Sequence, residues 1–367
     1  MVQAQEIRKW LEKGVEGEVF PGASAAVFRN GEEPAFAAAG VTRFGPASDQ
    51  VTPESVFDLA SLTKVLSTAT IAARLCDRGE LQLDEALSRY LEDLPWNEAW
   101  TGITVRDVLT HQAGFEAWRN FRKELTGKWR KCAPGAAELR TRVLSEIASS
   151  RPVGPRDSRT LYSDLGFILL GERLSRQAAI PLEELLNREV CGPLKLSLLT
   201  PDPLRHCPLT HVAATESVKA RRGVIHGEVH DDNAFLLGGL CGHAGLFGTS
   251  ADCLRVGMAW LAALGGSDGY LSRRVAGEFA SARSAPDGGK RALGWDVPSG
   301  EDSAAGKEVS PGAIGHLGFT GTSIWIDPTR KAVVVLLTNR VHPSAKNEAI
   351  RSFRPWFHDA VWRELDR

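Results

Sequence analysis

Short apolar runs bounded by turn residues occur near both ends of the chain and predict two β-hairpins. Near the N-terminus, residues 23–27 and 35–39 are mostly apolar, and Asn30-Gly31 between them is a strong hairpin-turn signal. Near the C-terminus, residues 324–326 and 333–337 form a second pair of apolar runs, joined by a turn that contains proline. The pattern therefore predicts strands at both ends of the chain.

Between the hairpins, from about residue 66 to residue 240, apolar positions recur mainly at helical spacing. The clearest predicted helix spans about residues 61–78, where apolar residues lie three and four positions apart and Gly79 follows as a C-cap. A final amphipathic helix is expected over about residues 345–365. Helices thus follow the first hairpin and the last one.

This order of elements predicts an α/β (α+β) fold in which strands from both ends share one antiparallel sheet flanked by helices. Residues 1–65 and 245–367 would form a discontinuous sheet domain. Residues 66–244 would form a mainly helical second lobe. We expect the active site in the cleft between the two lobes.

Composition narrows the classes of partner. Hydrophobic residues make up 43% and charged residues 24% of the 367 positions, as in ordinary globular proteins. A formal net charge of -1 argues against nucleic acid or an anionic membrane as a partner, and no run of 18 apolar residues is present. The first ten residues have no apolar signal-peptide core, so we expect a cytoplasmic protein, with a periplasmic one as the alternative if a leader precedes them.

The distribution of cysteine and histidine gives no metal signature. The six cysteines form no C-x-x-C pair and no zinc-finger spacing, so reduced thiols are expected. A group of His and acidic residues between His226 and His243 lacks the H-E-x-x-H pattern of a helical zinc site. We therefore expect no metal and no cofactor.

The most informative chemical feature is Ser61-Leu62-Thr63-Lys64, the only Ser-x-x-Lys in the chain. Residues at positions i and i+3 share one face of a helix, so the Lys64 amine can reach the Ser61 hydroxyl. A serine is a poor nucleophile until a base takes its proton, and a desolvated lysine can be that base. Ser61 at a helix start also fits the alternative of an ordinary N-cap.

Two further elements follow in order. The first is Leu161-Tyr162-Ser163-Asp164, which would place the Tyr162 phenol on a loop that enters a helix. The second is the stretch 315–322, which begins Gly315-His316-Leu317-Gly318-Phe319 and reads as a strand approached closely by another backbone or a ligand. Either element alone is more often a packing feature than a catalytic one.

Together, a Ser-x-x-Lys, a Tyr-x-Asn-like element about a hundred residues later and a His-x-Gly element near the last strands resemble the serine β-lactamase and penicillin-binding-protein superfamily. The chain is most similar to its class C-like branch, which includes carboxylesterases, DD-peptidases and cell-wall amidases. Other segments that match the pattern of this family include residues 20–23, 108–114, 242–247 and 337–340. The resemblance spans about residues 18–345 and implies a β-lactamase/transpeptidase-like fold.

The resemblance also implies roles for individual residues. Ser61 would be the nucleophile and Lys64 its base partner, with Tyr162 a second general base that shuttles the proton to the leaving group. The backbone N–H groups of Ser61 and Phe319 would form the oxyanion hole. Whether Lys64 or Tyr162 takes the serine proton stays open. His316, at the position of the motif's usual lysine, would be a fourth catalytic residue. The remaining positions implied to bind the oxyanion or the substrate are Asp164, Leu317, Gly318 and Arg340.

Three departures from the family pattern bear on the substrate. Leu317 stands where penicillin-recognising enzymes carry a Thr or Ser, and leucine forms no side-chain hydrogen bond. His316 replaces a lysine, so a group that titrates near pH 6.5 replaces a permanent charge. Asp164 replaces a neutral amide. All three favour an uncharged ester or amide over an anionic β-lactam.

Two classes of function are weighed. The first is a serine hydrolase that forms an acyl-enzyme, with a carboxylesterase ranked first, a cell-wall amidase or DD-peptidase second and a β-lactamase third. The second is a catalytically weak binding protein that keeps the fold. Ser61, Lys64 and Tyr162 favour the enzyme, whose partner would be a small ester or amide. Arg340, just after the last strand, would favour the cell-wall alternative if it bound a substrate carboxylate.

Overall fold

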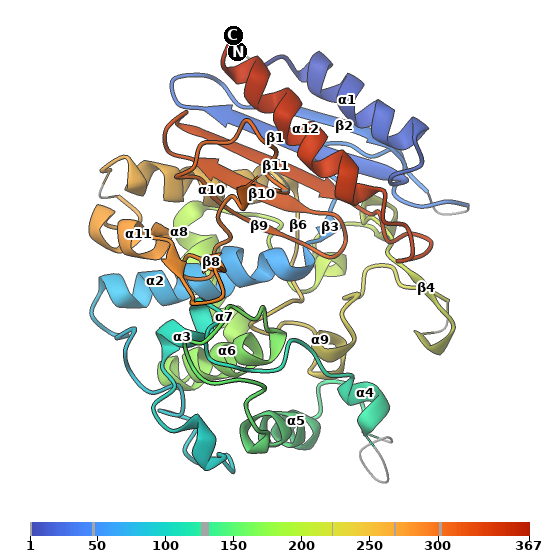
Figure 1. Ribbon diagram of the computed structural model, residues 1–367. Helices are drawn as coiled ribbons and strands as arrows, with labels where there is room; N and C mark the ends of the chain where they lie inside the picture. The colour runs from blue at the N-terminus through green and yellow to red at the C-terminus, as the bar shows by residue number, and fades with distance from the viewer. Residues whose placement is uncertain (1, 46–47, 126–131, 222, 268, 301–302) are drawn as a thin grey trace.

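The computed structural model describes the chain except for residues 1, 46–47, 126–131, 222, 268 and 301–302. Its centre is an antiparallel sheet of five strands in the order β2-β1-β11-β10-β9 (Figure 1). The two predicted hairpins supply four of these strands. The bounds are β1 Gly22–Arg29, β2 Ala35–Gly40, β9 Ile314–Leu317, β10 Ser323–Asp327 and β11 Ala332–Thr338.

The two ends of the chain meet in the middle of this sheet, where β1 pairs with β11 from Ala23↔Thr338 to Arg29↔Ala332. Because both faces are covered, these strands are mainly apolar rather than alternating, with Ser24 as the polar residue inside β1. Helices α1 (Ala4–Glu16) and α12 (Ile350–Leu365) pack on one face, and α10 (Ser250–Leu264) packs on the other. The sequence prediction of one shared antiparallel sheet is confirmed.

The remaining elements lie mostly beyond the α10 side of the sheet (Figure 1). The helices are α2 Thr70–Asp77, α3 Val105–Leu109, α4 Phe121–Glu124, α5 Ala137–Ser149, α6 Asp164–Ala178, α7 Leu182–Leu186, α8 Gly192–Leu194, α9 Asp232–Leu236 and α11 Arg273–Ala280. Two-residue strands form the pairs β3 (Phe57–Asp58) with β6 (Phe247–Gly248), β4 (Ser217–Val218) with β5 (Gly223–Val224), and β7 (Arg283–Ser284) with β8 (Lys290–Arg291). Short 3₁₀ or π turns cover Ala60–Leu62, Lys64–Ala69, Glu98–Trp100, Asn187–Cys191, Pro203–Arg205, Leu209–His211 and Lys219–Arg221.

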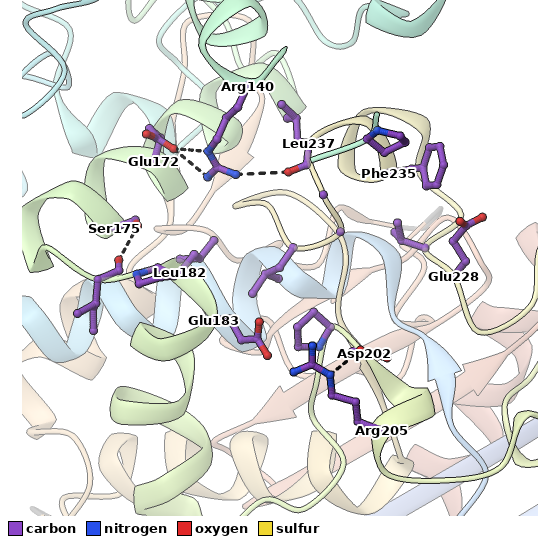
Figure 2. Close-up of a pocket in the computed structure, with 18 of the residues that line it drawn as sticks. Arg140, Glu172, Ser175, Leu182, Glu183, Asp202, Arg205, Glu228, Phe235 and Leu237 are labelled. Carbon is purple, nitrogen blue, oxygen red and sulfur yellow. Dashed lines mark hydrogen bonds and ion pairs between the residues drawn. The ribbon is translucent and has the colours of Figure 1, made fainter. Parts of the chain in front are cut away.

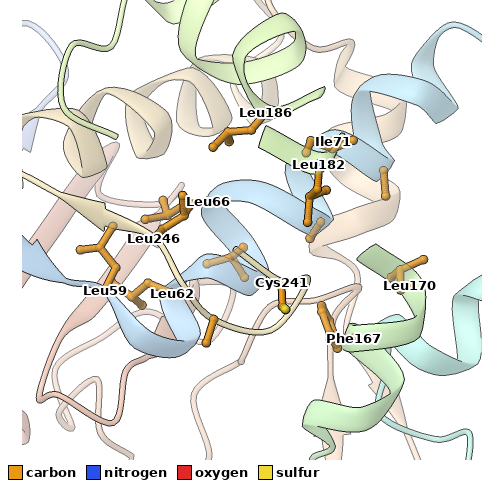
Figure 3. Close-up of a cluster of buried hydrophobic side chains, with 14 of the residues drawn as sticks. Leu59, Leu62, Leu66, Ile71, Phe167, Leu170, Leu182, Leu186, Cys241 and Leu246 are labelled. Atoms are coloured by element: carbon orange, nitrogen blue, oxygen red, sulfur yellow. The ribbon is translucent and has the colours of Figure 1, made fainter. Parts of the chain in front are cut away.

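The segment that carries Ser61 and Lys64 runs through the main hydrophobic core (Figure 3). Leu62 and Leu66 are fully buried in this cluster, together with Phe167 and Leu170 of α6. The apolar side chains predicted from their spacing therefore pack this segment into the core. The polar residues Ser61 and Lys64, and Asp164 at the start of α6, are the ones available to form the site.

Two predicted helices differ from those observed. The predicted helix 61–78 begins as a 3₁₀ turn and widens into a π-helical turn before α2 starts at Thr70. The Thr70 hydroxyl donates to the Val65 carbonyl five residues earlier (2.6 Å), a bond that fits the wider spacing. The last helix begins at Ile350 rather than near Ala345, because Arg340 binds the Ala345 and Asn347 carbonyls in a loop.

No helix in the part of the chain that the structure describes is both long enough and apolar enough to cross a membrane.

Candidate active site

The backbone just before Ser61 is held in an unusual conformation by a buried carboxylate. Ala60 has a φ of +47°, and its N–H donates to Asp58 Oδ1 (2.8 Å). The other carboxylate oxygen of Asp58 accepts from the backbone N–H of His230 (2.7 Å). Burial raises the pKa of Asp58 above its ordinary value, although these N–H donors act in the opposite direction. Asp58 thus fixes the turn that presents Ser61 and ties it to the loop at His230.

Lys64 lies fully buried beneath Ser61 and uses three hydrogen-bond donors. Its Nζ donates to Ser61 Oγ (3.1 Å), to Asp164 Oδ1 (2.6 Å) and to the backbone oxygen of His243 (3.1 Å). Burial alone would lower the pKa of Lys64, but the Asp164 carboxylate and Tyr162 raise it above the ordinary value. The resting site therefore holds an ammonium group that points at the serine oxygen.

Tyr162 lies just before α6, as its place in the sequence predicted, and its ring is packed among cationic groups. Lys64 Nζ is 4.8 Å from the ring centroid and the Arg291 guanidinium carbon is 5.3 Å from it. Burial raises the pKa of the Tyr162 phenol above its ordinary value, while Lys64 and a hydrogen bond with Ser61 act to lower it. The phenol is thus neutral at rest and contacts both members of the Ser-x-x-Lys motif.

The edge strand β9 closes the site on the opposite side and approaches the Ser61 turn closely. A Cβ added to Gly318 would lie 2.7 Å from the Leu59 carbonyl oxygen, so only glycine fits there. The hydroxyls of Thr320 and Thr322 donate to the backbone oxygens of Asp58 (2.8 Å) and Leu59 (3.2 Å). These contacts fix the spacing between the two backbones that flank the cleft.

Two backbone N–H groups remain available for a developing oxyanion. Neither Ser61 N–H nor Phe319 N–H donates a hydrogen bond to another of the described residues, and both residues line the cleft. The N–H of Gly318, in contrast, donates to the Thr322 carbonyl (2.8 Å). Gly318 therefore allows the close approach of the two backbones but offers no free N–H donor to a substrate. Paired free N–H groups beside a nucleophile are the usual means of stabilising a tetrahedral intermediate.

His316 on β9 is a neutral imidazole. Its Nδ1 hydrogen-bonds to the Leu317 carbonyl oxygen (2.8 Å), which requires a proton on Nδ1, and its Nε2 has no partner among the described residues. Burial lowers the pKa of His316 well below its ordinary value, and the nearby cations Lys64 and Arg291 lower it further. This environment favours the neutral imidazole as the working form of His316.

Replacing His316 by Lys tests this electrostatic arrangement. A fixed cation beside Tyr162 and Lys64 favours the phenolate and disfavours the ammonium, so it lowers the pKa of either candidate base. We expect the acid limb of the kcat/KM profile to move to lower pH by about one unit or more in His316→Lys. The measurement is ester hydrolysis between pH 5 and pH 10.

His316→Asn is the matched control, because its amide keeps a donor for the Leu317 carbonyl and stays uncharged. Its acid limb should stay where the wild-type limb lies. An unchanged profile with near-normal rates in His316→Lys would show that His316 is only structural.

The cleft that these elements enclose has a volume of about 850 Å³. Lys64 lies beneath its floor, and the other eight residues singled out in the sequence line it: Ser61, Tyr162, Asp164, His316, Leu317, Gly318, Phe319 and Arg340. Two large apolar side chains also line this cleft with much of their surface exposed, Trp118 (43%) and Phe319 (54%). The cleft therefore combines many polar and charged side chains with two exposed aromatic surfaces.

The Arg340 side chain forms its hydrogen bonds with backbone carbonyl groups of the protein itself. Its Nε donates to the Phe319 carbonyl (2.8 Å), its Nη1 binds two carbonyls of the following loop, and its guanidinium carbon lies 4.6 Å from the Phe319 ring centroid. The Phe319 ring also stacks on His230. These contacts indicate that Arg340 holds the Phe319 loop in place. They give less support to the carboxylate-binding role considered from the sequence.

Sequence reasoning missed Asp58, Arg291 and the support beneath Lys64. His243, whose carbonyl accepts from Lys64, pairs through Nε2 with Asp231 Oδ1 (2.9 Å), and Asp231 also caps α9. The His and acidic residues that suggested a metal site thus form a loop beside the cleft. Across the described residues, no three His, Cys, Asp or Glu side chains gather as a metal ion would require.

A second cavity of about 1060 Å³ lies against α6 and α7 (Figure 2). Two pairs of charged side chains are joined within its wall, Arg140 with Glu172 (2.8 Å) and Arg205 with Asp202 (2.8 Å). The hydroxyl of Ser175 donates to the Ile180 carbonyl (2.6 Å). The arrangement in this wall is structural, and the cleft at Ser61 is the better active-site candidate.

Comparisons with known proteins agree with this geometry. A family model described as Beta-lactamase matches residues 7–353. A putative D-alanyl-D-alanine carboxypeptidase of Salmonella heidelberg (strain SL476) is 28% identical over 323 residues, which cover 82% of this chain and 73% of that protein.

Solved structures share the fold at lower identity. The LovD6 mutant of simvastatin synthase from Aspergillus terreus gives a TM-score of 0.73 at 18% identity, over 99% of this chain and 97% of that one. EstCE1, a hydrolase with promiscuous acyltransferase activity, gives 0.68 at 21% identity, over 96% and 98%. The chain thus belongs to the beta-lactamase family and is a serine hydrolase of the β-lactamase and penicillin-binding-protein superfamily.

Proposed function

We propose that the protein is a carboxylesterase that cleaves small uncharged esters through an acyl-enzyme on Ser61. The observation that carries this proposal is the contact of Lys64 Nζ with Ser61 Oγ (3.1 Å) in a cleft that also presents the exposed aromatic side chains of Trp118 and Phe319. The cleft would separate the two lobes expected from the sequence, residues 1–65 with 245–367 and residues 66–244.

In the proposed reaction, the Tyr162–Lys64 pair first loses one proton to solvent. Ser61 Oγ then attacks the ester carbonyl while its proton passes to that deprotonated pair. The N–H groups of Ser61 and Phe319 stabilise the oxyanion that forms. The same pair returns a proton to the departing alcohol, and water then releases the acid from Ser61. Because the pKa values of Lys64 and Tyr162 are both raised, the deprotonated pair forms only as the pH rises, so activity should increase towards alkaline pH.

The substrate class follows from the walls of the cleft. Leu317 and the exposed faces of Trp118 and Phe319 offer apolar contact for an acyl chain or an alcohol group. Leu317 provides no hydroxyl for a substrate carboxylate. These side chains favour an uncharged ester over a penicillin.

One observation favours a second candidate, a carboxypeptidase of the kind named for the Salmonella relative. Arg354 of α12 lines the same cleft and is buried, yet its only hydrogen bond in the described structure is from Nη2 to the Gly318 carbonyl (3.3 Å). Burial lowers the pKa of Arg354 to about 10, and Arg340 adds to the effect. A buried cation without an acid partner would gain from a substrate carboxylate.

Matched substrates separate the two candidates. An acyl-D-Ala-D-lactate and its methyl ester differ only in the terminal carboxylate. We expect the methyl ester to lose its D-lactate group at least tenfold faster, with slow or no turnover of penicillins and cephalosporins, because a carboxylate held against Leu317 without a hydrogen-bond donor loses its hydration at a cost of about 1–3 kcal/mol or more. The measurement is kcat/KM for each substrate.

Arg354→Met is the control variant. If the protein prefers the free carboxylate and Arg354→Met removes that preference, the carboxypeptidase is the correct assignment. Rapid cephalosporin turnover with little ester cleavage would reverse the ranking in favour of a β-lactamase.

A further inference from the structure

We infer that His111 is a positioning residue, which holds the Tyr162 phenol in place by binding the backbone on both sides of it. This inference rests on the proposed function, because it concerns how the proton-transfer residue is oriented. His111 belongs to the phrase Val108–Gly114 and contacts neither Ser61 nor Lys64 by a hydrogen bond.

The hydrogen bonds of His111 bracket Tyr162. The carbonyl of His111 accepts from the N–H of Leu161 (2.9 Å), and its Nδ1 accepts from the N–H of Ser163 (3.0 Å). The imidazole also packs on the phenol ring, with centroids 4.6 Å apart and planes inclined by 35°. Three contacts from one residue therefore fix both neighbours of Tyr162 and one face of its ring.

The loop after His111 forms further hydrogen bonds with the residues that lead from Tyr162 into α6. The Ser163 hydroxyl donates to the Glu116 carbonyl (2.7 Å), and the N–H of Asp164 donates to the Ala117 carbonyl (2.9 Å). His111 itself has a φ of +56°, a left-handed conformation that histidine adopts more readily than most residues. The loop 111–117 thus sets the position of Tyr162 and of the carboxylate that pairs with Lys64.

The bond from Ser163 requires an unprotonated Nδ1. The groups that face this imidazole are Arg291 of β8, Lys64 beneath Ser61 and His316 of β9. Burial lowers the pKa of His111 well below its ordinary value, and those three groups lower it further. The acceptor is therefore present at every pH at which a serine hydrolase of this kind is assayed, and it is lost only if the side chain is changed.

Two variants separate the acceptor from the ring. His111→Phe keeps an aromatic ring against Tyr162 but removes the acceptor. His111→Asn keeps an acceptor near the position of Nδ1, tolerates a positive φ and removes the ring. We expect His111→Phe to lower kcat about 100-fold with KM within threefold of the wild-type value, because small displacements of a proton-transfer group have effects of this size. His111→Asn should keep at least a tenth of the wild-type kcat.

A double-variant cycle shows whether His111 acts through Tyr162. In a Tyr162→Phe background, His111→Phe should change the rate of Ser61 labelling by a fluorophosphonate less than threefold. Additive losses, or equal losses in His111→Phe and His111→Asn, would overturn the inference. If His111→Phe does not fold, His111→Gly takes its place in the same double-variant cycle. Glycine suits the positive φ and also removes the Nδ1 acceptor.

A spectroscopic measurement does not depend on activity. The chain has three tyrosines, so 3-fluorotyrosine labelling gives three ¹⁹F resonances, and Tyr162→Phe identifies one of them. That resonance should broaden in His111→Phe, where Tyr162 is held less firmly. In His111→Asn it should stay as narrow as in the wild type, although loss of the adjacent imidazole ring shifts its position. A resonance that stays narrow in His111→Phe would overturn the inference, whereas normal activity in Tyr162→Phe would instead overturn the proposed role of Tyr162.

Discussion

Replacing Ser61 by Ala is expected to lower kcat for ester hydrolysis by on the order of a millionfold, the largest effect of any single change in this protein. The substitution removes the only atom on which the acyl group would form. The neighbouring Lys64, Tyr162 and backbone donors remain, but they have no nucleophile to activate. The measurement is release of p-nitrophenol from a short-chain ester, with active-site titration to exclude traces of wild-type enzyme.

The fold should survive this change. The Ser61 side chain is partly exposed, and its hydroxyl accepts a hydrogen bond from Lys64 without supporting the core. A thermal midpoint within a few degrees of the wild-type value would separate loss of chemistry from loss of structure. Activity within tenfold of wild type would rule out Ser61 as the nucleophile.

Replacing Lys64 by Met is expected to lower kcat by about 10²- to 10⁴-fold, the range for losing a proton-transfer group. It should also destabilise the protein. The Asp164 carboxylate loses the ammonium that lies 2.6 Å away, and breaking one side of a buried ion pair costs on the order of 3 kcal/mol. Because Asp164 keeps 16% of its side-chain surface exposed, the cost should lie at or below that figure. Chemical denaturation and steady-state kinetics measure the two effects separately.

The variant Lys64→Met/Asp164→Asn separates stability from catalysis. Removing both charges should restore most of the lost stability, because neither partner then remains buried and unpaired. Activity should stay at the level of Lys64→Met. Recovery of activity together with stability would mean that Lys64 is a structural partner of Asp164 rather than part of the proton path.

The sheet and the motif positions could be predicted because each depends on local sequence. Asn30-Gly31 and the apolar runs fix both hairpins, and β1 and β11 then pair because each is apolar on both faces. The spacing of Ser61 and Lys64 brings them within hydrogen-bond distance even though the segment is a 3₁₀ and π turn there. In the 3₁₀ turn that carries Ser61, a three-residue separation places two side chains on one side.

The supporting contacts could not be predicted, because they join segments distant in sequence. Asp58 binds the N–H of His230, and Lys64 binds the carbonyl of His243, 179 residues later. The cation Arg354 reaches the cleft only because α12 packs against the end of β9. Backbone acceptors and donors carry no side-chain signature, so no residue pattern marks these partners before the chain is folded.

The most direct test of the central claim is mass spectrometry of the intact protein and its peptides after incubation with a fluorophosphonate and, separately, with a slowly released ester. We predict one adduct per chain, located on the peptide that contains Ser61 and absent from Ser61→Ala. An adduct on any other residue, or unchanged labelling of Ser61→Ala, would contradict an acyl-enzyme mechanism at this site.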